Sequence, residues 1–159
     1  MRTVLKGNLE LDPRTSAYLF AADRAEHLWG KSGSNCGIEK KCSDGKIVIS
    51  DRYFFSSLTY QSVTCGEELP RLLNSAFPLP QILFFFKISP EISLKRVDVR
   101  GEREIYEKID FLQATEERYE KLMDEYESKN TEMKIVRLDA AKSKEEVSAQ
   151  IWQELSKLL

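Results

Sequence analysis

The sequence predicts an α/β fold in which helices cover both faces of a parallel β-sheet. Three short runs are rich in apolar and β-branched residues, and segments with helical periodicity separate them. Strands that are almost continuously apolar are typical of parallel sheets buried on both faces. The 159 residues show no internal repeat and no shift in composition, so we expect one domain over residues 1–159.

The first helix is expected from Pro13 to about Trp29. Asp12 is a good N-cap residue, and proline is favoured at the first helical position. One face of this helix carries Ala17, Phe20, Ala21, Arg24 and Leu28. The stretch from Gly30 to Gly45 is rich in Gly, Ser, Asn and Lys and has no apolar periodicity, which predicts a surface loop.

The predicted strands are residues 46–50, 81–88 and 134–138, and each is expected to be buried. Helices are expected over 67–77, from Pro90 onward, over 104–129 with an apolar stripe, and from Ser143 through Leu155. Residues 1–11 resemble the tail of a helix that ends at Gly7. Three strands are few for this fold class, so we expect part of the sheet to be missing from these residues.

Composition limits the classes of partner. A net charge of -2 argues against nucleic acid or an anionic membrane as the main partner, because both need a basic surface. The longest apolar run, Ile82 to Phe86, is far below the roughly 20 residues that cross a bilayer, and we expect a cytoplasmic protein. Free thiols are a better interpretation of Cys36, Cys42 and Cys65 than a zinc site with His27.

Two small groups of residues could carry chemistry. Asp51 and Arg52 directly follow a predicted strand, where parallel α/β sheets bind ligands, although a structural ion pair would look the same in sequence. Arginine suits phosphate because its planar fork can bind two oxygens. Phe20 and Arg24 are four residues apart on one helix face, which suits a nucleotide clamp but is also typical of a core ring beside a rim arginine.

Several multi-residue segments occur together in a specific order. They are Leu11 to Thr15, Leu19 to His27, Gly45 to Tyr53, Ser56-Ser57, Tyr60-Gln61, Ser89 to Glu91, Arg96 to Arg103, Asp139-Ala140 and Trp152. In this order they closely resemble the thymidylate kinase family, which transfers the γ-phosphoryl group of ATP to dTMP with Mg²⁺. The resemblance covers most of the chain. Thr59 and Ser62 depart from the alanine and glycine that are usual in the family.

The resemblance implies a role for each matched residue. Phe20 would stack on thymine, and Arg24 would contact the thymine edge or the nearby phosphate. Arg52 would clamp the dTMP phosphate, beside Asp51 as a partner of the substrate or of Mg²⁺. The remaining substrate contacts implied by the resemblance are Ser56, Ser57, Tyr60 and Gln61. It also implies a homodimer formed through the first long helix.

The segment of about residues 96–107 resembles the mobile lid that folds over ATP. Arg96, Arg100 and Arg103 would supply positive charge to the transferred phosphate, with Arg100 and Arg103 as catalytic residues. A solvated charged helix end is the alternative. Glu104 to Glu107 stand where many members have an aspartate-arginine-aromatic triplet, so this lid resembles a subset of the family.

The ATP-binding motif of the family is absent from the 159 residues. No Gly-x-x-x-x-Gly-Lys-Ser/Thr sequence occurs, and Gly30-Lys31-Ser32 follows a predicted helix rather than a strand. The resemblance therefore implies a P-loop nucleoside-monophosphate-kinase-like sheet that lacks its first strand-helix units. We expect the chain alone to be inactive, and either destabilised or completed by another polypeptide.

Three interpretations follow from the sequence. The first is a thymidylate kinase shortened by a misplaced start or a frameshift, which the upstream DNA would reveal. The second is a non-catalytic nucleotide-binding or dimerising remnant in which Phe20, Arg24 and Arg52 still hold dTMP. The third is another nucleoside or nucleotide kinase, because Asp-Arg after a strand recurs among P-loop kinases. The segments around Arg24 and Tyr60 favour thymidylate.

Overall fold

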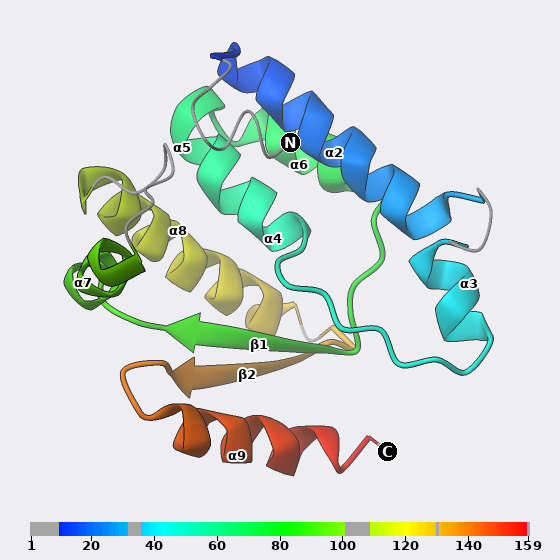
Figure 1. Cartoon of the computed structure of the whole chain (residues 1–159). Coiled ribbons are helices and arrows are strands. Elements are labelled where there is room, and N and C mark those ends of the chain that lie inside the picture. Colours follow the sequence, from blue (N-terminus) through cyan, green and yellow to red (C-terminus); the bar gives the residue numbers. More distant parts are fainter. Residues whose placement is uncertain (1–9, 32–35, 101–108, 130, 159) are drawn as a thin grey trace. The chain divides into compact units, whose positions relative to one another are not determined.

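The computed structural model describes residues 10–31, 36–100, 109–129 and 131–158, and for 97–100 it describes the backbone alone. These residues form a mixed α/β structure with a small parallel sheet (Figure 1). They divide into two compact units, residues up to 77 and residues from 78 onward, and each unit is described by itself. The expectation of one domain stays a prediction.

Unit 1 contains only helices among its described residues. They are α2 (Pro13–Trp29), α3 (Ile38–Ser43), α4 (Phe54–Ser56), the π-helix η1 (Ser57–Gln61), α5 (Ser62–Cys65) and α6 (Glu68–Asn74). The prediction for α2 is confirmed at both ends. The Asp12 side chain accepts a hydrogen bond of 2.9 Å from the backbone N–H of Arg14, which caps the helix.

The predicted loop from Gly30 to Gly45 contains the short helix α3, which sequence analysis missed. Gly37 permits the chain to turn tightly against the end of α2, because a Cβ atom there would lie 2.2 Å from the carbonyl oxygen of Leu28. The Gly37 N–H also donates to the Gly30 carbonyl oxygen at 2.8 Å. This close backbone contact, rather than apolar periodicity, starts α3.

The prediction of a buried strand over 46–50 is wrong. These residues are outside any strand, and the side chains of Ile47 and Ile49 are 68% and 83% exposed. A strand requires a ladder partner as well as a suitable sequence. Among the described residues no strand pairs with this segment, so Ile47 and Ile49 face solvent.

Residues 54–65 form a nearly continuous helical stretch that sequence analysis did not predict. At its centre, η1 widens the helix, and the buried Thr59 hydroxyl donates to the carbonyl oxygens of Phe55 at 3.1 Å and Ser56 at 3.0 Å. Hydroxyls that bond to the preceding turn distort helices, and π-helical turns are frequent at functional sites. The helix predicted over 67–77 is present in a shorter form as α6.

Unit 2 contains the sheet. Its elements are β1 (Ile82–Lys87), α7 (Pro90–Arg100), α8 (Ile109–Ser128), β2 (Lys134–Asp139) and α9 (Lys144–Leu155). The two strands are parallel, and their register runs from Ile82 opposite Lys134 to Lys87 opposite Asp139. These strands and helices confirm the predictions for 81–88, 134–138, Pro90 and Ser143. Ser143 caps α9 in a capping box with Glu146.

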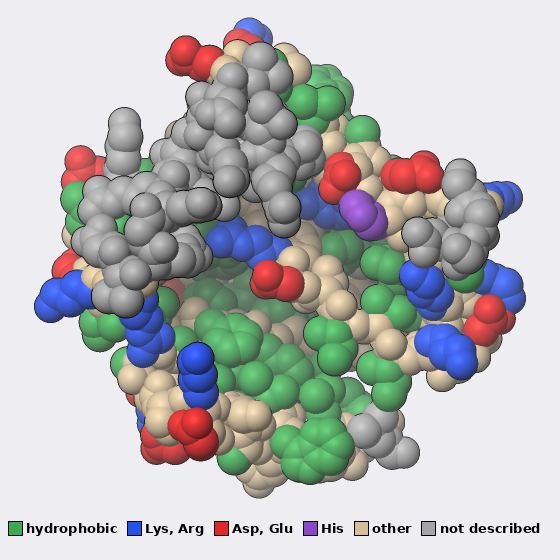
Figure 2. Space-filling model, in the orientation of Figure 1, with side chains coloured by type: hydrophobic (Ala, Val, Ile, Leu, Met, Phe, Trp, Pro, Cys, Tyr) green, Lys and Arg blue, Asp and Glu red, His purple; other side chains and the backbone are tan. Residues whose placement is uncertain are grey.

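The sheet is only partly covered. On the side drawn in Figure 2, hydrophobic side chains gather over the two strands, and Phe86 is 49% exposed. The prediction that β1 is fully buried is therefore wrong. Met123 of α8 and Leu138 of β2 are buried and form part of the core.

The predicted helix over 104–129 is present as α8, while 1–9 and 101–108 lie outside the described residues. Across the described ranges, no helix is both long and apolar enough to span a bilayer.

Candidate functional site

Arg24 lies at the meeting point of α2, η1 and α6 in unit 1. Its Nη2 donates to the Ser57 hydroxyl oxygen at 2.9 Å, and its Nη1 donates to Oδ1 of Asn74. These partners are 33 and 50 residues away along the chain. The fold therefore brings together two residues that the sequence had marked, Arg24 and Ser57, and adds Asn74.

Aromatic rings flank the same guanidinium. Its Cζ atom lies 5.3 Å from the centroid of Phe77 and 5.8 Å from that of Tyr53, both within cation–π range. Burial lowers the pKa of Arg24, and it also raises the pKa of Tyr53 to about 12. At neutral pH Arg24 remains a cation and Tyr53 a neutral phenol.

No carboxylate of the described residues is in direct contact with Arg24, although the charge of the neighbouring Asp23 favours its cationic form. Among the described residues Arg24 forms no ion pair with a carboxylate, and its hydrogen-bond partners are neutral groups. Partial burial of a cation without an anionic partner costs free energy unless a bound ligand supplies further hydrogen-bond acceptors. The arrangement can therefore attract a phosphate, a carboxylate or a carbonyl oxygen of a base.

Arg52 has an unusual backbone. Its φ of 66° lies in the left-handed region, which non-glycine residues rarely adopt. The Ser50 hydroxyl donates to the Arg52 carbonyl oxygen at 2.7 Å, and the guanidinium lies 5.0 Å from the centroid of the Tyr60 ring. Strained residues of this kind cluster at functional sites. Asp51 and Arg52 are both exposed.

The other predicted substrate contacts lie on the same elements. Phe20 is half-buried on α2, one turn before Arg24. Ser56 is half-buried at the end of α4, and Gln61 is buried at the end of η1.

The predicted lid is described only in part. Arg96 lies on α7 in unit 2, where its Nη1 donates to the carbonyl oxygen of Ala140 at 2.8 Å. Arg100 is the last residue of α7, and its side chain lies outside the described part of the structure, as does all of Arg103. A contact of these arginines with a phosphate stays a prediction.

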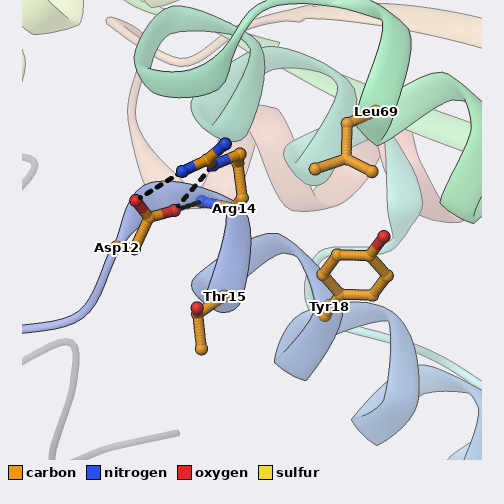
Figure 3. A pocket seen from close by; sticks show the side chains of 5 residues that line it. All are labelled: Asp12, Arg14, Thr15, Tyr18 and Leu69. Carbon is orange, nitrogen blue, oxygen red and sulfur yellow. Dashed lines mark hydrogen bonds and ion pairs between the residues drawn. The ribbon is translucent and has the colours of Figure 1, made fainter.

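A hollow lies near the start of α2 and is lined by Asp12, Arg14, Thr15, Tyr18 and Leu69. Figure 3 shows that Asp12 and Arg14 are paired with each other. None of the residues predicted to contact dTMP lines this hollow, so its position does not support a nucleotide site there. In the described part of the chain, no group of three His, Cys, Asp or Glu residues could hold a metal.

Sequence reasoning missed three members of the Arg24 cluster. Asn74 and Phe77 lie at and just beyond the end of α6, and Tyr53 precedes α4. Tyr53 was within reach of a sequence argument, because it follows the Asp51-Arg52 pair. Asn74 and Phe77 carried no sequence signal, because their role depends on how α6 packs against α2.

Comparisons with known proteins place the chain beside one family. The family model described as thymidylate kinase matches residues 1–151. A protein of Treponema pallidum with thymidylate kinase in its name is 35% identical over 156 residues, covering 98% of this chain and 73% of that protein. The thymidylate kinase of Malacoplasma penetrans is 33% identical over 151 residues, covering 91% and 68%. For a similarly named protein of Pyrobaculum aerophilum the identity is 34% over 148 residues, covering 92% and 70%.

Proposed function

Because this chain belongs to the thymidylate kinase family, we propose that its first unit binds dTMP and that it serves the ATP-dependent phosphorylation of dTMP to dTDP. The chain covers 68–73% of the three relatives described above. The proposal therefore assigns the acceptor site to this chain and leaves the ATP phosphates to a glycine-rich loop that these 159 residues do not contain.

The observation that carries the proposal is the contact between Arg24 and Ser57. The family resemblance implies that Arg24 contacts the thymine edge or the nearby phosphate and that Ser57 lies where the family hydrogen-bonds the base. The half-buried Arg24 has only neutral hydrogen-bond partners among the described residues. A base carbonyl or a phosphate oxygen would complete its coordination. In this proposal Phe20 stacks on the base from one helical turn away, Ser56 and Gln61 give further substrate contacts, and Tyr60 packs against the sugar.

Arg52 clamps the dTMP phosphate in this proposal. Its left-handed backbone and its position over the Tyr60 ring support a functional role, because such conformations are retained where they aim a side chain. Mg²⁺ in phosphoryl-transfer sites is commonly held by one or two carboxylates and the substrate phosphates. The exposed carboxylate of Asp51 fits that requirement and would be the ligand from this unit.

Binding of the ATP phosphates requires groups that these 159 residues do not contain. Phosphoryl transfer depends on positioning the β- and γ-phosphates and on stabilising the charge between them, which a P-loop does with backbone amides and a lysine. Arg96, Arg100 and Arg103 would supply part of that charge from the lid. We expect turnover only when a P-loop segment is joined to the chain or provided by another polypeptide.

A second candidate function is a nucleotide-binding or dimerising remnant without catalysis. One observation favours dimerisation: the large apolar side chains of Tyr18, Leu19 and Trp29 on α2 are 56%, 41% and 41% exposed. Exposed apolar side chains of this size suit a helix-to-helix contact between two copies. The three free cysteines suit the cytoplasm, which we propose as the location. Another nucleoside kinase remains the third alternative.

The test compares dTMP with thymidine by calorimetric titration of the wild-type chain and of Arg52→Ala. If Arg52 clamps the phosphate, the substitution weakens dTMP by about 1.5 to 3 kcal/mol and thymidine far less. An equal loss for both ligands would make Arg52 structural. A coupled ADP-release assay on the chain and on a fusion with a family P-loop segment then tests turnover, and robust activity of the chain alone would refute the proposal about ATP.

A further inference from the structure

We infer that Asn74 is a positioning residue for dTMP, because its buried amide holds the Arg24 guanidinium in the orientation that meets the ligand. This inference rests on the proposed function and deepens it. The family resemblance implies no role for Asn74. The assignment comes from the contact between α6 and α2, 50 residues apart along the chain.

The amide of Asn74 has one defined orientation. Its Oδ1 accepts from Nη1 of Arg24, and its Nδ2 donates to the carbonyl oxygen of Pro70 at 2.7 Å. Turning the amide over would place an NH₂ group against the guanidinium and an oxygen against a carbonyl oxygen. Both contacts would be repulsive, so the two partners together fix the acceptor that faces Arg24.

Asn74 also stands on a well-packed support. Its side chain is 5% exposed, and Pro70, one turn earlier on α6, is among the most deeply buried residues of the described chain. Three residues later, Phe77 contacts the ring of Trp29 at a centroid distance of 5.4 Å and lies beside the Arg24 guanidinium. A side chain held on such a support can impose its geometry on a flexible arginine.

The neutrality of Asn74 matters as much as its position. Arginine has many rotamers, and ordering it before the ligand arrives removes part of the entropy cost of binding. A carboxylate at this position would also order Arg24, but it would cancel the charge that attracts an anion or a base carbonyl. The amide fixes the guanidinium and leaves its charge available.

A double-mutant cycle tests this role. Asn74→Leu removes both hydrogen bonds and keeps a branched side chain with the same number of heavy atoms. It is measured alone and together with Arg24→Met, and dTMP affinity is read by calorimetry or NMR titration. We expect Asn74→Leu to weaken dTMP about tenfold when Arg24 is present, as the loss of a hydrogen bond to a charged group implies. In the Arg24→Met background we expect a change below about twofold.

The same fold-loss in both backgrounds, or no loss in either, would overturn the inference. Thr115→Val is the control, because it removes a different buried side-chain hydrogen bond, from the Thr115 hydroxyl to the Phe111 carbonyl oxygen in unit 2, without touching Arg24. It should leave dTMP affinity unchanged. If Asn74→Leu does not fold, Asn74→Ala takes its place in the cycle.

A ligand-free measurement separates this inference from the proposed function. NMR of the Arg24 side chain should give distinct Nη signals in the wild-type protein, because the two hydrogen bonds slow rotation of the guanidinium. These signals should merge in Asn74→Leu and persist in Thr115→Val. Merged signals in the wild-type protein would refute the ordering of Arg24 by Asn74, whereas a folded wild-type protein with distinct signals and no dTMP affinity would refute the proposed function and leave that ordering intact.

Discussion

Replacing Arg52 by glycine should give a more stable protein than replacing it by alanine. Both substitutions remove the guanidinium and its contact with the Tyr60 ring, so they differ only in how the backbone tolerates a φ of 66°. Alanine keeps the steric conflict between its Cβ atom and the backbone in the left-handed region, and glycine removes it.

The magnitude follows from two opposing terms. Relief of the left-handed conformation is worth about 1 to 2 kcal/mol. The greater conformational freedom of glycine in the unfolded chain lowers the free energy of unfolding by about 0.5 to 1 kcal/mol. From the middle of each range, the free energy of unfolding of Arg52→Gly should exceed that of Arg52→Ala by about 0.75 kcal/mol, or roughly 2 °C in melting temperature for a chain of this size.

Urea and thermal denaturation of the two variants measure this difference. Gly45→Ala is the matched control of opposite sign, because Gly45 has a φ of 74° and an added Cβ would meet nothing within 4 Å. It should destabilise the protein through backbone strain alone. An Arg52→Gly variant no more stable than Arg52→Ala, beside a destabilised Gly45→Ala, would show that Arg52 is not strained.

Three further predictions concern stability. Ile49→Ser should change the free energy of unfolding by no more than about 0.5 kcal/mol, because the side chain is already exposed, and a loss of several kcal/mol in urea denaturation would restore the buried-strand interpretation. Gly37→Ala should cost about 1 to 3 kcal/mol by the same assay, because its Cβ would meet the Leu28 carbonyl oxygen; an unchanged urea midpoint would contradict this. A hydrogen bond from Lys134 lowers the pKa of Glu154, so its stabilisation is complete above the ordinary carboxyl pKa and is lost as the pH falls through the lowered one. The melting-temperature advantage of the wild type over Glu154→Gln should shrink on acidification, and a constant advantage would refute this.

Elements with local signals were predictable. The Asp12 cap before Pro13 marked the start of α2 and Ser143 marked the start of α9, because both residues lie directly before the helix they cap. The apolar runs of β1 and β2 likewise predicted strands that the structure contains. These features depend on neighbours in sequence, so they can be read without knowledge of the tertiary structure.

Elements that depend on distant partners were not predictable. The segment of residues 46–50 has a strand-like composition, but pairing decides whether a strand forms. The π-helical turn around Thr59 depends on hydrogen bonds to the preceding turn. Asn74 joins Arg24 only through the packing of two helices. In the candidate site, sequence therefore singled out Arg24 and Ser57, which the fold brings into contact, and missed Asn74, which contacts Arg24.

The central claim, that unit 1 recognises dTMP, is tested most directly by calorimetric titration of the purified chain with dTMP, dAMP and dGMP. A ring at Phe20 and a hydrogen-bonding pair formed by Arg24 and Ser57 match a pyrimidine with a carbonyl edge. We predict measurable dTMP affinity and at least about tenfold weaker affinity for the purine monophosphates, equivalent to about 1.4 kcal/mol. Equal affinity for all three nucleotides, or no binding by a folded chain, would contradict the claim.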